Sequence, residues 1–385
     1  MFEKVIPMIK RQFANIMQIN MSSEKLLSID VGFRNIKVAE VEIIEGKEIF
    51  LRNYGIAPTP RGCIKNGVIS NVSEIKTRIS KIINENNMKT KNAKIVMSGT
   101  SIITRVFMVE KKTNEDIDKT IKTHISELMP INAEKYQVDY KILKEIRDEG
   151  KNLIKVFVTA VRKSIIDSYV QVLKEVGLVP VSIDIPSNSV AKFFNRNINV
   201  SENEIKNSKV STSNKKGDSI VAVLDFGSET TIVNILRDKI LEFNKVILLG
   251  SSNIDEAISD AMKIDVDRGE NLKKFYGMVL PDVNSADEHL RVHEPVISVV
   301  DKIIKQIGLC FQFYETKCYG ESIDKIFIIG GGSLLKGLRP YLEESLGVPV
   351  YSTSLLNIDG VRIAQQLDAE RLNFLINSVG ITLKM

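Results

Sequence analysis

Two short stretches of the sequence each carry an aspartate at the point where a buried strand is expected to end. The first is SIDVGFRNIKVAEV, which contains Asp30, and the second is AVLDFGSETTIVNI, which contains Asp225. Both run from apolar residues through Asp and Gly to a short turn and then to a second apolar run, and they lie about half the chain apart. This match predicts a duplicated domain with an equivalent hairpin in each half.

The glycine turns of these hairpins have the composition of phosphate-binding loops. Backbone N–H groups in a tight turn can point at one anion, and glycine lets the anion approach closely. Two such turns would hold a polyphosphate, while the carboxylates of Asp30 and Asp225 hold Mg²⁺, which keeps several waters and needs few protein ligands. An aspartate that only caps its turn explains one hairpin equally well, but it does not explain a matched pair.

Two further stretches fit a nucleoside. IFIIGGGSLL places three glycines after a buried strand, where a flat base or ribose can lie against the backbone; it is not a P-loop, because Leu338 and Arg339 stand where Lys and Ser or Thr must follow. In DRGENLKKFYG, Glu270 and Lys273 share one helical face, so the carboxylate can accept from ribose hydroxyls while the lysine stem covers the base. A solvated pair three residues apart is the simpler interpretation of that spacing.

Strand-like and helix-like segments alternate along the chain, which predicts an α/β fold. Residues 104–178 have a different, compact α+β pattern, and residues 199–217 are polar and lack any periodicity. The expected organisation is an N-terminal segment of residues 1–23, a first lobe of 24–103 plus 179–198, an inserted subdomain of 104–178, a flexible linker of 199–217 and a second lobe of 218–385.

The N-terminal segment is amphipathic. Its apolar residues recur at helical spacing, at Phe2, Val5, Ile6, Ile9, Phe13, Ile16 and Met17. Two interpretations stay open: a helix that lies on a membrane or on a partner, or a helix that packs on its own domain.

The composition limits the class of protein. Of the 385 residues 43% are hydrophobic and 26% are charged, as in ordinary globular proteins, and the net charge of +5 permits an acidic partner without requiring one. We expect no nucleic-acid partner, because basic residues do not alternate with aromatic ones. Three cysteines without metal-type spacing favour a reducing compartment, and no apolar run is long enough to span a bilayer. We therefore expect a cytoplasmic protein.

These stretches, in this order, resemble the actin-like ATPase superfamily, which implies two duplicated α/β lobes around a cleft that binds ATP and Mg²⁺. The resemblance assigns the first phosphate loop to Asp30, Gly32, Phe33, Arg34 and Asn35, and the second to Asp225, Gly227, Ser228, Glu229, Thr230 and Thr231. It assigns further nucleotide contacts to Gly250, Glu270, Lys273, Gly330, Gly331, Gly332 and Ser333. It also places Asp184, in VSIDIPSNSVAKFF, near the γ-phosphate, with catalytic roles for Asp30, Asp184 and Asp225 and metal ligation by Asp30 and Asp225.

Within the superfamily, HISELMPINAEKYQVDYKIL, GSSNIDEAIS and FLINSVGITLKM are similar to the PilM family of type IV pilus assembly proteins. This resemblance implies an ATP-binding scaffold with an FtsA-type insert, in which the nucleotide sets the geometry of the lobes. The implied partner is the cytoplasmic N-terminal tail of a PilN-type inner-membrane protein, held in a groove beside the insert. It implies recruitment to the inner face of the cell membrane, contacts with other pilus assembly proteins and self-association.

The first loop departs from the family pattern, since Phe33, Arg34 and Asn35 stand where small hydroxyl residues are usual. Arg34 can neutralise phosphate charge, whereas Phe33 can crowd the site, so we expect at most slow ATPase activity. Two alternatives stay open. One is an FtsA-like membrane-associated division protein anchored by residues 2–17, and the other is a small-molecule kinase of the same fold, which would need a general base and a substrate pocket.

Overall fold

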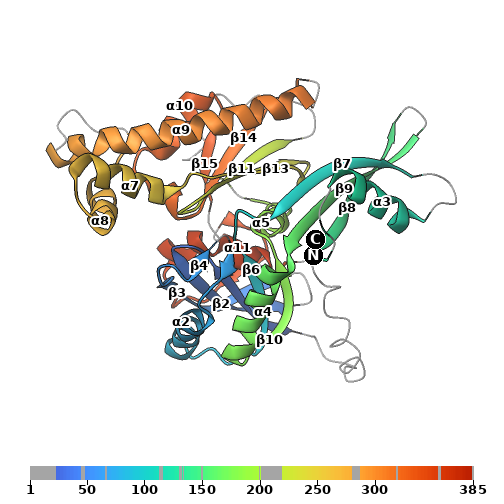
Figure 1. The fold of residues 1–385 in the computed structure, drawn as a ribbon, viewed down its shortest axis with the longest axis horizontal. Helices are drawn as coiled ribbons and strands as arrows, with labels where there is room; N and C mark the ends of the chain where they lie inside the picture. The colour runs from blue at the N-terminus through green and yellow to red at the C-terminus, as the bar shows by residue number, and fades with distance from the viewer. Residues whose placement is uncertain are drawn as a thin grey trace. The chain divides into compact units, whose positions relative to one another are not determined.

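The computed structural model describes residues 23–44, 48–65, 67–111, 116–129, 132, 134–148, 151–198, 200, 219–279, 287–317, 320–353 and 357–383. The chain divides into two compact units, residues 1–189 with 381–384 and residues 190–380 with 385 (Figure 1). The amphipathic segment expected over residues 1–23 and the linker expected over 199–217 lie outside the described residues, apart from Ser23 and Val200.

The first unit is built on a mixed β-sheet. Its strands follow the order β10-β6-β1-β2-β3, with β1 (Glu24–Val31), β2 (Asn35–Ile44), β3 (Glu48–Pro58), β6 (Asn92–Met97) and β10 (Val179–Asp184). The β1, β2 and β3 strands are antiparallel, whereas β1, β6 and β10 are parallel. Every residue of β1 from Leu26 to Val31 is buried, as expected for a central strand that is covered on both faces.

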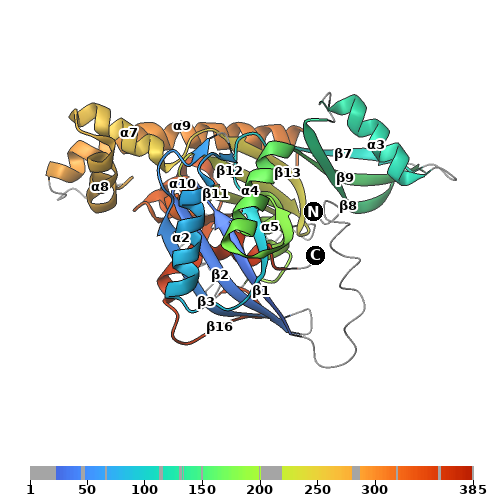
Figure 2. The same ribbon diagram turned by 60° about the horizontal axis from the view of Figure 1, so that its bottom comes forward.

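Two amphipathic helices cover this sheet. The α2 helix (Val72–Glu85) buries Ile75, Ile79 and Ile82 at helical spacing, and it packs against α4 (Lys163–Val176) (Figure 2). The α4 helix also contacts β6 and β10. Although the sequence pattern placed α4 in the insert, its apolar face therefore packs on the main sheet.

The rest of the expected insert has its own core. A three-stranded antiparallel sheet in the order β7-β9-β8 is formed by β7 (Ile103–Glu110), β8 (Tyr136–Asp148) and β9 (Lys151–Arg162), and α3 (Ile117–Leu128) packs on one face. Ile121 and Ile125 of α3 meet Ile154, Val156 and Val158 of β9 in this core. The β4 (Ile64–Lys65) and β5 (Val68–Ile69) strands form a separate short hairpin.

The second unit repeats the sheet of the first. Its order is β13-β12-β11-β14-β15, with β11 (Ile220–Phe226), β12 (Thr231–Arg237), β13 (Ile240–Ile247), β14 (Lys325–Ile329) and β15 (Val350–Ser352). Here too the first three strands of the unit are antiparallel to one another. The β14 strand pairs parallel to β11, and β15 pairs parallel to β14. Each hairpin that carries a matched aspartate therefore occupies the same position in its sheet, which confirms the predicted duplication.

Helices complete the second unit. The 31-residue α9 (Asp287–Lys317) lays an apolar face on the core through residues such as Val296, Ile303 and Ile307. In α10 (Leu338–Leu346) Pro340 lies in the first turn, and Gly347 ends the helix with φ +64°, the arrangement expected from sequence. The remaining elements are α5 (Pro186–Phe194), α7 (Ser251–Met262), α8 (Val266–Tyr276), η2 (Gly331–Leu334), β16 (Val361–Ile363), η4 (Ala369–Leu375) and α11 (Ile376–Gly380).

One buried side chain holds both connections between the insert and the main sheet of the first unit. Tyr169 of α4 is fully buried, and its hydroxyl accepts from the backbone N–H of Ser98 at 3.3 Å and donates to the carbonyl of Ser98 at 3.2 Å. Ser98 leads from β6 into β7, and α4 follows β9 directly. Burial raises the pKa of Tyr169 above its ordinary value, so the hydroxyl keeps the proton that it donates.

We expect Tyr169→Phe to lower the free energy of unfolding by about 1–3 kcal/mol, because it removes the partner of two part-buried backbone groups of Ser98. Urea denaturation followed by circular dichroism measures this change. The matched control is Tyr341→Phe, which removes an exposed hydrogen bond to Asp301 (2.6 Å), and its effect should be much smaller. Equal effects of the two substitutions would contradict the role given to Tyr169.

Candidate functional site

The first candidate loop connects β1 to β2. Gly32 closes it by donating its N–H to the carbonyl of Asn35 at 3.1 Å. Thr59, just after β3, fixes it from the side: its hydroxyl donates to the carbonyl of Gly32 (2.7 Å), and its N–H donates to the carbonyl of Arg34 (3.0 Å). Phe33, Arg34 and Asn35 are each half-buried. The loop is therefore held in one conformation by backbone bonds and one threonine.

The carboxylate of Asp30 is buried and paired with a lysine. Asp30 is 2% exposed, and Lys37 Nζ lies 2.7 Å from its Oδ2. The two residues are directly opposite in the β1–β2 pair. A buried carboxylate needs such a partner, because removing an unpaired charge from water is very unfavourable. Lys37 brings a positive charge beside the first loop, where it can also meet a phosphate.

Asp184 ends the strand two places from β1. Both Asp30 and Asp184 are in register with Val96 of β6, so the two carboxylates stand at the same carboxyl edge of the sheet, where α/β folds bind ligands. Asp184 Oδ1 accepts from the N–H of Ile185 at 2.8 Å, and Oδ2 accepts from Asn188 Nδ2 at 2.6 Å. In this structure Asp184 is held at the entry to α5 by these two hydrogen bonds, and a role near a γ-phosphate stays a prediction.

The second candidate loop has the same closure. The N–H of Gly227 donates to the carbonyl of Thr230 at 2.9 Å, the counterpart of the bond made by Gly32. The first turn of α7 is attached to this loop, since the N–H groups of Ser251 and Ser252 donate to the carbonyls of Gly227 (3.0 Å) and Ser228 (2.8 Å). The loop therefore sits on the positive end of a helix, which favours an anion nearby.

The close contact between the second loop and the start of α7 requires a glycine at position 250. A Cβ atom at this position would lie within 3.0 Å of the carbonyl oxygen of Ser228 and the nitrogen of Thr230. Thr231 adds a bond from its hydroxyl to the carbonyl of Leu249 at 2.9 Å. The structure thus brings Gly250 to the second loop, while its contact with a nucleotide stays a prediction.

Glu229 lies at the tip of the same loop. Partial burial, together with the negative charge of Glu256, raises the pKa of its carboxyl group. A cation at this loop would remove that repulsion.

Asp225 is enclosed from two directions. It is 8% exposed, and its Oδ2 accepts from Asn377 Nδ2 of α11 at 2.9 Å. On the other side, a Cβ at Gly330 would lie within 3.0 Å of Asp225 Oδ1 and the carbonyl of Phe226, and Gly330 has a φ of +84°. Only glycine fits this position, both for space and for backbone conformation.

The glycine motif lies beside the second loop at the carboxyl edge of the second sheet. Asp225 is in register with Ile329 of β14, and Gly330 to Ser333 follow this strand. Ser333 closes the turn by donating to the carbonyl of Gly330 at 2.6 Å, and a Cβ at Gly331 would touch the ring of Phe374. The second unit thus brings the predicted residues of loop and glycine motif together.

Glu270 and Lys273 each have a charged partner on α7 or α8. Glu270 Oε1 lies 2.9 Å from Lys274 Nζ. Lys273 Nζ lies 2.6 Å from Asp255 Oδ1 and donates to the carbonyl of Ser251 at 2.9 Å. Lys273 therefore reaches the start of α7, beside the second loop, while the predicted contacts of both residues with a nucleoside stay predictions.

The residues present fit a magnesium nucleotide. The buried aspartate of either unit suits Mg²⁺, which takes one or two carboxylates and keeps its waters. The amide oxygen of Asn377, beside Asp225, is buried without a hydrogen-bond partner among the described residues. Within those residues no three His, Cys, Asp or Glu side chains converge as a metal site, and none of the described helices is long and apolar enough to span a membrane.

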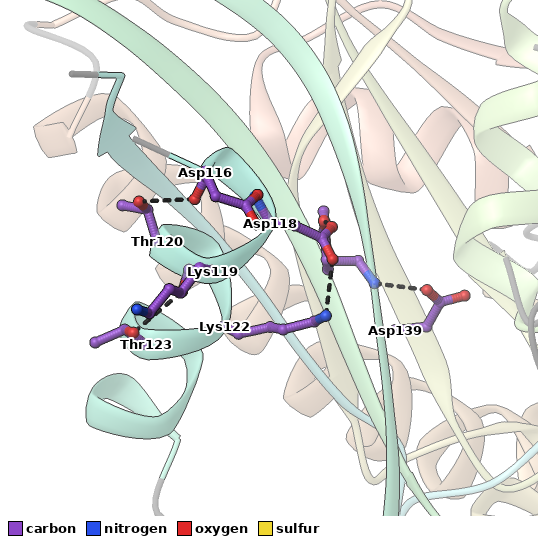
Figure 3. Close-up of polar contacts among 8 residues, drawn as sticks. Asp116, Asp118, Lys119, Thr120, Lys122, Thr123 and Asp139 are labelled. Atoms are coloured by element: carbon purple, nitrogen blue, oxygen red, sulfur yellow. Dashed lines mark hydrogen bonds and ion pairs between the residues drawn. The ribbon is translucent and has the colours of Figure 1, made fainter. Parts of the chain in front are cut away.

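The insert presents a second candidate surface. A shallow polar hollow of about 440 Å³ lies along the first turns of α3 (Figure 3). Lys122 pairs with Asp118 at 2.7 Å, and Tyr140 of β8 also hydrogen-bonds Asp118. Because these charges are satisfied within the insert, the hollow is weak evidence for a charged ligand. Apolar side chains are exposed elsewhere on the insert, including Met108 (40%) and Leu128 (55%).

Sequence reasoning missed three residues of the site: Lys37, Thr59 and Asn377. The partner of Asp30 had a signal, since a four-residue turn at residues 32–35 places Lys37 opposite Asp30. Thr59 and Asn377 had none, because their contacts join residues that are 27 and 152 positions apart.

Comparison with known proteins places this geometry in a family. A family model described as type IV pilus assembly protein PilM matches residues 28–384. Among solved structures, a PilM-PilN type IV pilus biogenesis complex is 19% identical, with 93% of this chain and 98% of that chain covered and a TM-score of 0.75. The ethanolamine utilization protein EutJ from Carboxydothermus hydrogenoformans is 12% identical, with 97% and 93% covered and a TM-score of 0.53.

The fold class expected from the two hairpins is therefore confirmed as the actin-like ATPase fold. The family match covers both loops, the insert and the glycine motif. The chain belongs to the PilM family of type IV pilus assembly proteins.

Proposed function

We propose that this protein is an ATP-binding scaffold of type IV pilus assembly, which binds the cytoplasmic tail of a PilN-type inner-membrane protein. The observation that carries the nucleotide part is the pair of equivalent loops, each closed by a glycine N–H bond after a buried aspartate. The family match supports the pilus part. It gives no support to the FtsA-like and kinase alternatives.

The residues of each loop have distinct roles in this proposal. Backbone N–H groups within the turns, at residues 33–35 and 228–230, bind phosphate oxygens, and Lys37 and Arg34 neutralise their charge. Asp30 and Asp225 hold a hydrated Mg²⁺, which supplies charge neutralisation when bound. The open backbone of Gly330 to Gly332 receives the nucleoside.

We infer slow hydrolysis at most from the first loop, where Phe33, Arg34 and Asn35 stand in place of small hydroxyl residues. Asp184 accepts hydrogen bonds from Ile185 and Asn188, and its carboxylate has further lone pairs that can accept a proton. In this proposal the nucleotide acts mainly by setting the arrangement of the lobes.

The insert is the proposed partner-binding element. One of the similar solved structures is a PilM-PilN complex. In this protein the insert has its own packed core and exposes apolar side chains. On β7, Phe107 and Val109 face α3, so Met108 points to the opposite face of the sheet. We infer that the tail binds on this opposite face. The protein would then work at the inner face of the membrane, with other pilus assembly proteins and copies of itself as further partners.

Calorimetric titration with ATP and Mg²⁺ tests the nucleotide site. We expect the folded wild-type protein to bind, and Asp30→Ala and Asp225→Ala each to weaken binding at least about tenfold, or ~1.4 kcal/mol. Asp260→Ala, an exposed position of α7, is the matched control and should bind like the wild type. The proposal is wrong if the folded wild-type protein binds no ATP, or if the two site variants bind it as tightly.

Fluorescence anisotropy with a labelled PilN-type tail peptide tests the partner site. Met108→Asp should weaken peptide binding roughly tenfold or more, because a charge then replaces an apolar contact. Leu128→Asp places the same charge at an exposed position at the end of α3 and should leave binding unchanged. The opposite ranking would put the tail on the α3 side, and no binding by any form would remove the peptide partner from the proposal.

A further inference from the structure

We propose that Asn377 is a metal-positioning residue, and this inference rests on the proposed function. Its amide nitrogen would fix the carboxylate of Asp225, and its amide oxygen would accept a hydrogen bond from a water molecule of hydrated Mg²⁺. The residue comes from α11, near the end of the chain, and was not part of either predicted phosphate loop.

The geometry around Asp225 leaves little freedom to its carboxylate. Asn377 Nδ2 donates to Oδ2 at 2.9 Å, while Gly330 lies against Oδ1. Oδ2 is therefore held by a hydrogen bond, and Oδ1 lies in a space that only a glycine at position 330 leaves open. The carboxylate is held in place before any ligand binds, which is the arrangement that a metal ligand needs.

The two ends of the Asn377 amide are not equally satisfied. Its Nδ2 has the Asp225 partner, but its Oδ1 is buried and has no hydrogen-bond partner among the described residues. Exchanging the two ends would turn the amide oxygen toward the carboxylate oxygen, and two acceptors repel each other. The orientation is thus set by Asp225, and the unsatisfied oxygen is a consequence of it.

A carboxylate next to an amide oxygen selects a ligand that donates hydrogen bonds. Phosphate oxygens are acceptors and would be repelled by this pair, whereas a water molecule on Mg²⁺ has two polarised O–H groups to give. Since Mg²⁺ loses its waters reluctantly, a water in this position joins the metal to the protein without direct ligation. The backbone N–H groups of the turn itself, at residues 228–230, remain for the phosphate.

The segment that carries Asn377 is rigidly packed. Leu375, Ile376 and Val379 are at most 2% exposed, and the ring of Phe374 lies against Gly331 of the glycine motif. Asn377 is therefore held between buried neighbours at the same carboxyl edge as Asp225.

The test compares ATP affinity in Mg²⁺ with ATP affinity in EDTA, measured by calorimetry on the full-length protein. Asn377→Leu keeps the volume but removes both polar ends. We expect it to reduce the Mg²⁺-dependent gain in affinity about five- to tenfold, and to change the affinity in EDTA less than about twofold. Asn377→Asp returns an oxygen and adds a charge, so the Mg²⁺-dependent gain should exceed that of the wild type.

Asn244→Leu is the matched control. It removes an amide that donates a 2.9 Å hydrogen bond to Asn234 within the same sheet, away from Asp225, and it should leave the Mg²⁺-dependent gain unchanged. An unaltered gain in folded Asn377→Leu would overturn the inference and leave Asn377 a purely structural residue. If Asn377→Leu does not fold, a gain in Asn377→Asp no larger than in the wild type overturns it instead. If the folded wild-type protein binds ATP in neither condition, the proposed function itself fails.

Discussion

The constraint on which the site depends is the burial of one carboxylate at the end of a central strand in each sheet. Asp30 and Asp225 are 2% and 8% exposed, and a carboxylate so far from water must be paired. The two units meet this need differently, with the ammonium group of Lys37 in the first and the neutral amide of Asn377 in the second.

The duplicated sheet gives these carboxylates equivalent positions. In both units an antiparallel hairpin is followed by strands that pair parallel to its first strand, so each aspartate stands where a parallel strand ends. The loops are then fixed by what surrounds them: Thr59 holds the first, and the start of α7 holds the second. Because glycine closes both loops, backbone N–H groups remain the main donors for an anion.

The insert is joined to the main sheet of the first unit and still has its own hydrophobic core. Its three strands and α3 enclose an apolar cluster, while α4 packs on the main sheet and brings Tyr169 to Ser98. Both the entering and the leaving connections of the insert are therefore attached at one point, next to the strand that pairs with β1.

The sequence by itself determined the elements, the duplication and most of the loop residues, because hydrophobic periodicity and glycine turns act over a few neighbouring residues. The order of the motifs along the chain was also enough to recognise the family. Only the tertiary structure decided that α4 belongs with the main sheet, that Lys273 pairs with Asp255, that Asn188 holds Asp184 and that Asn377 holds Asp225. These outcomes depend on contacts between residues distant in sequence or on a choice among nearby partners, and no local pattern encodes which of them will meet.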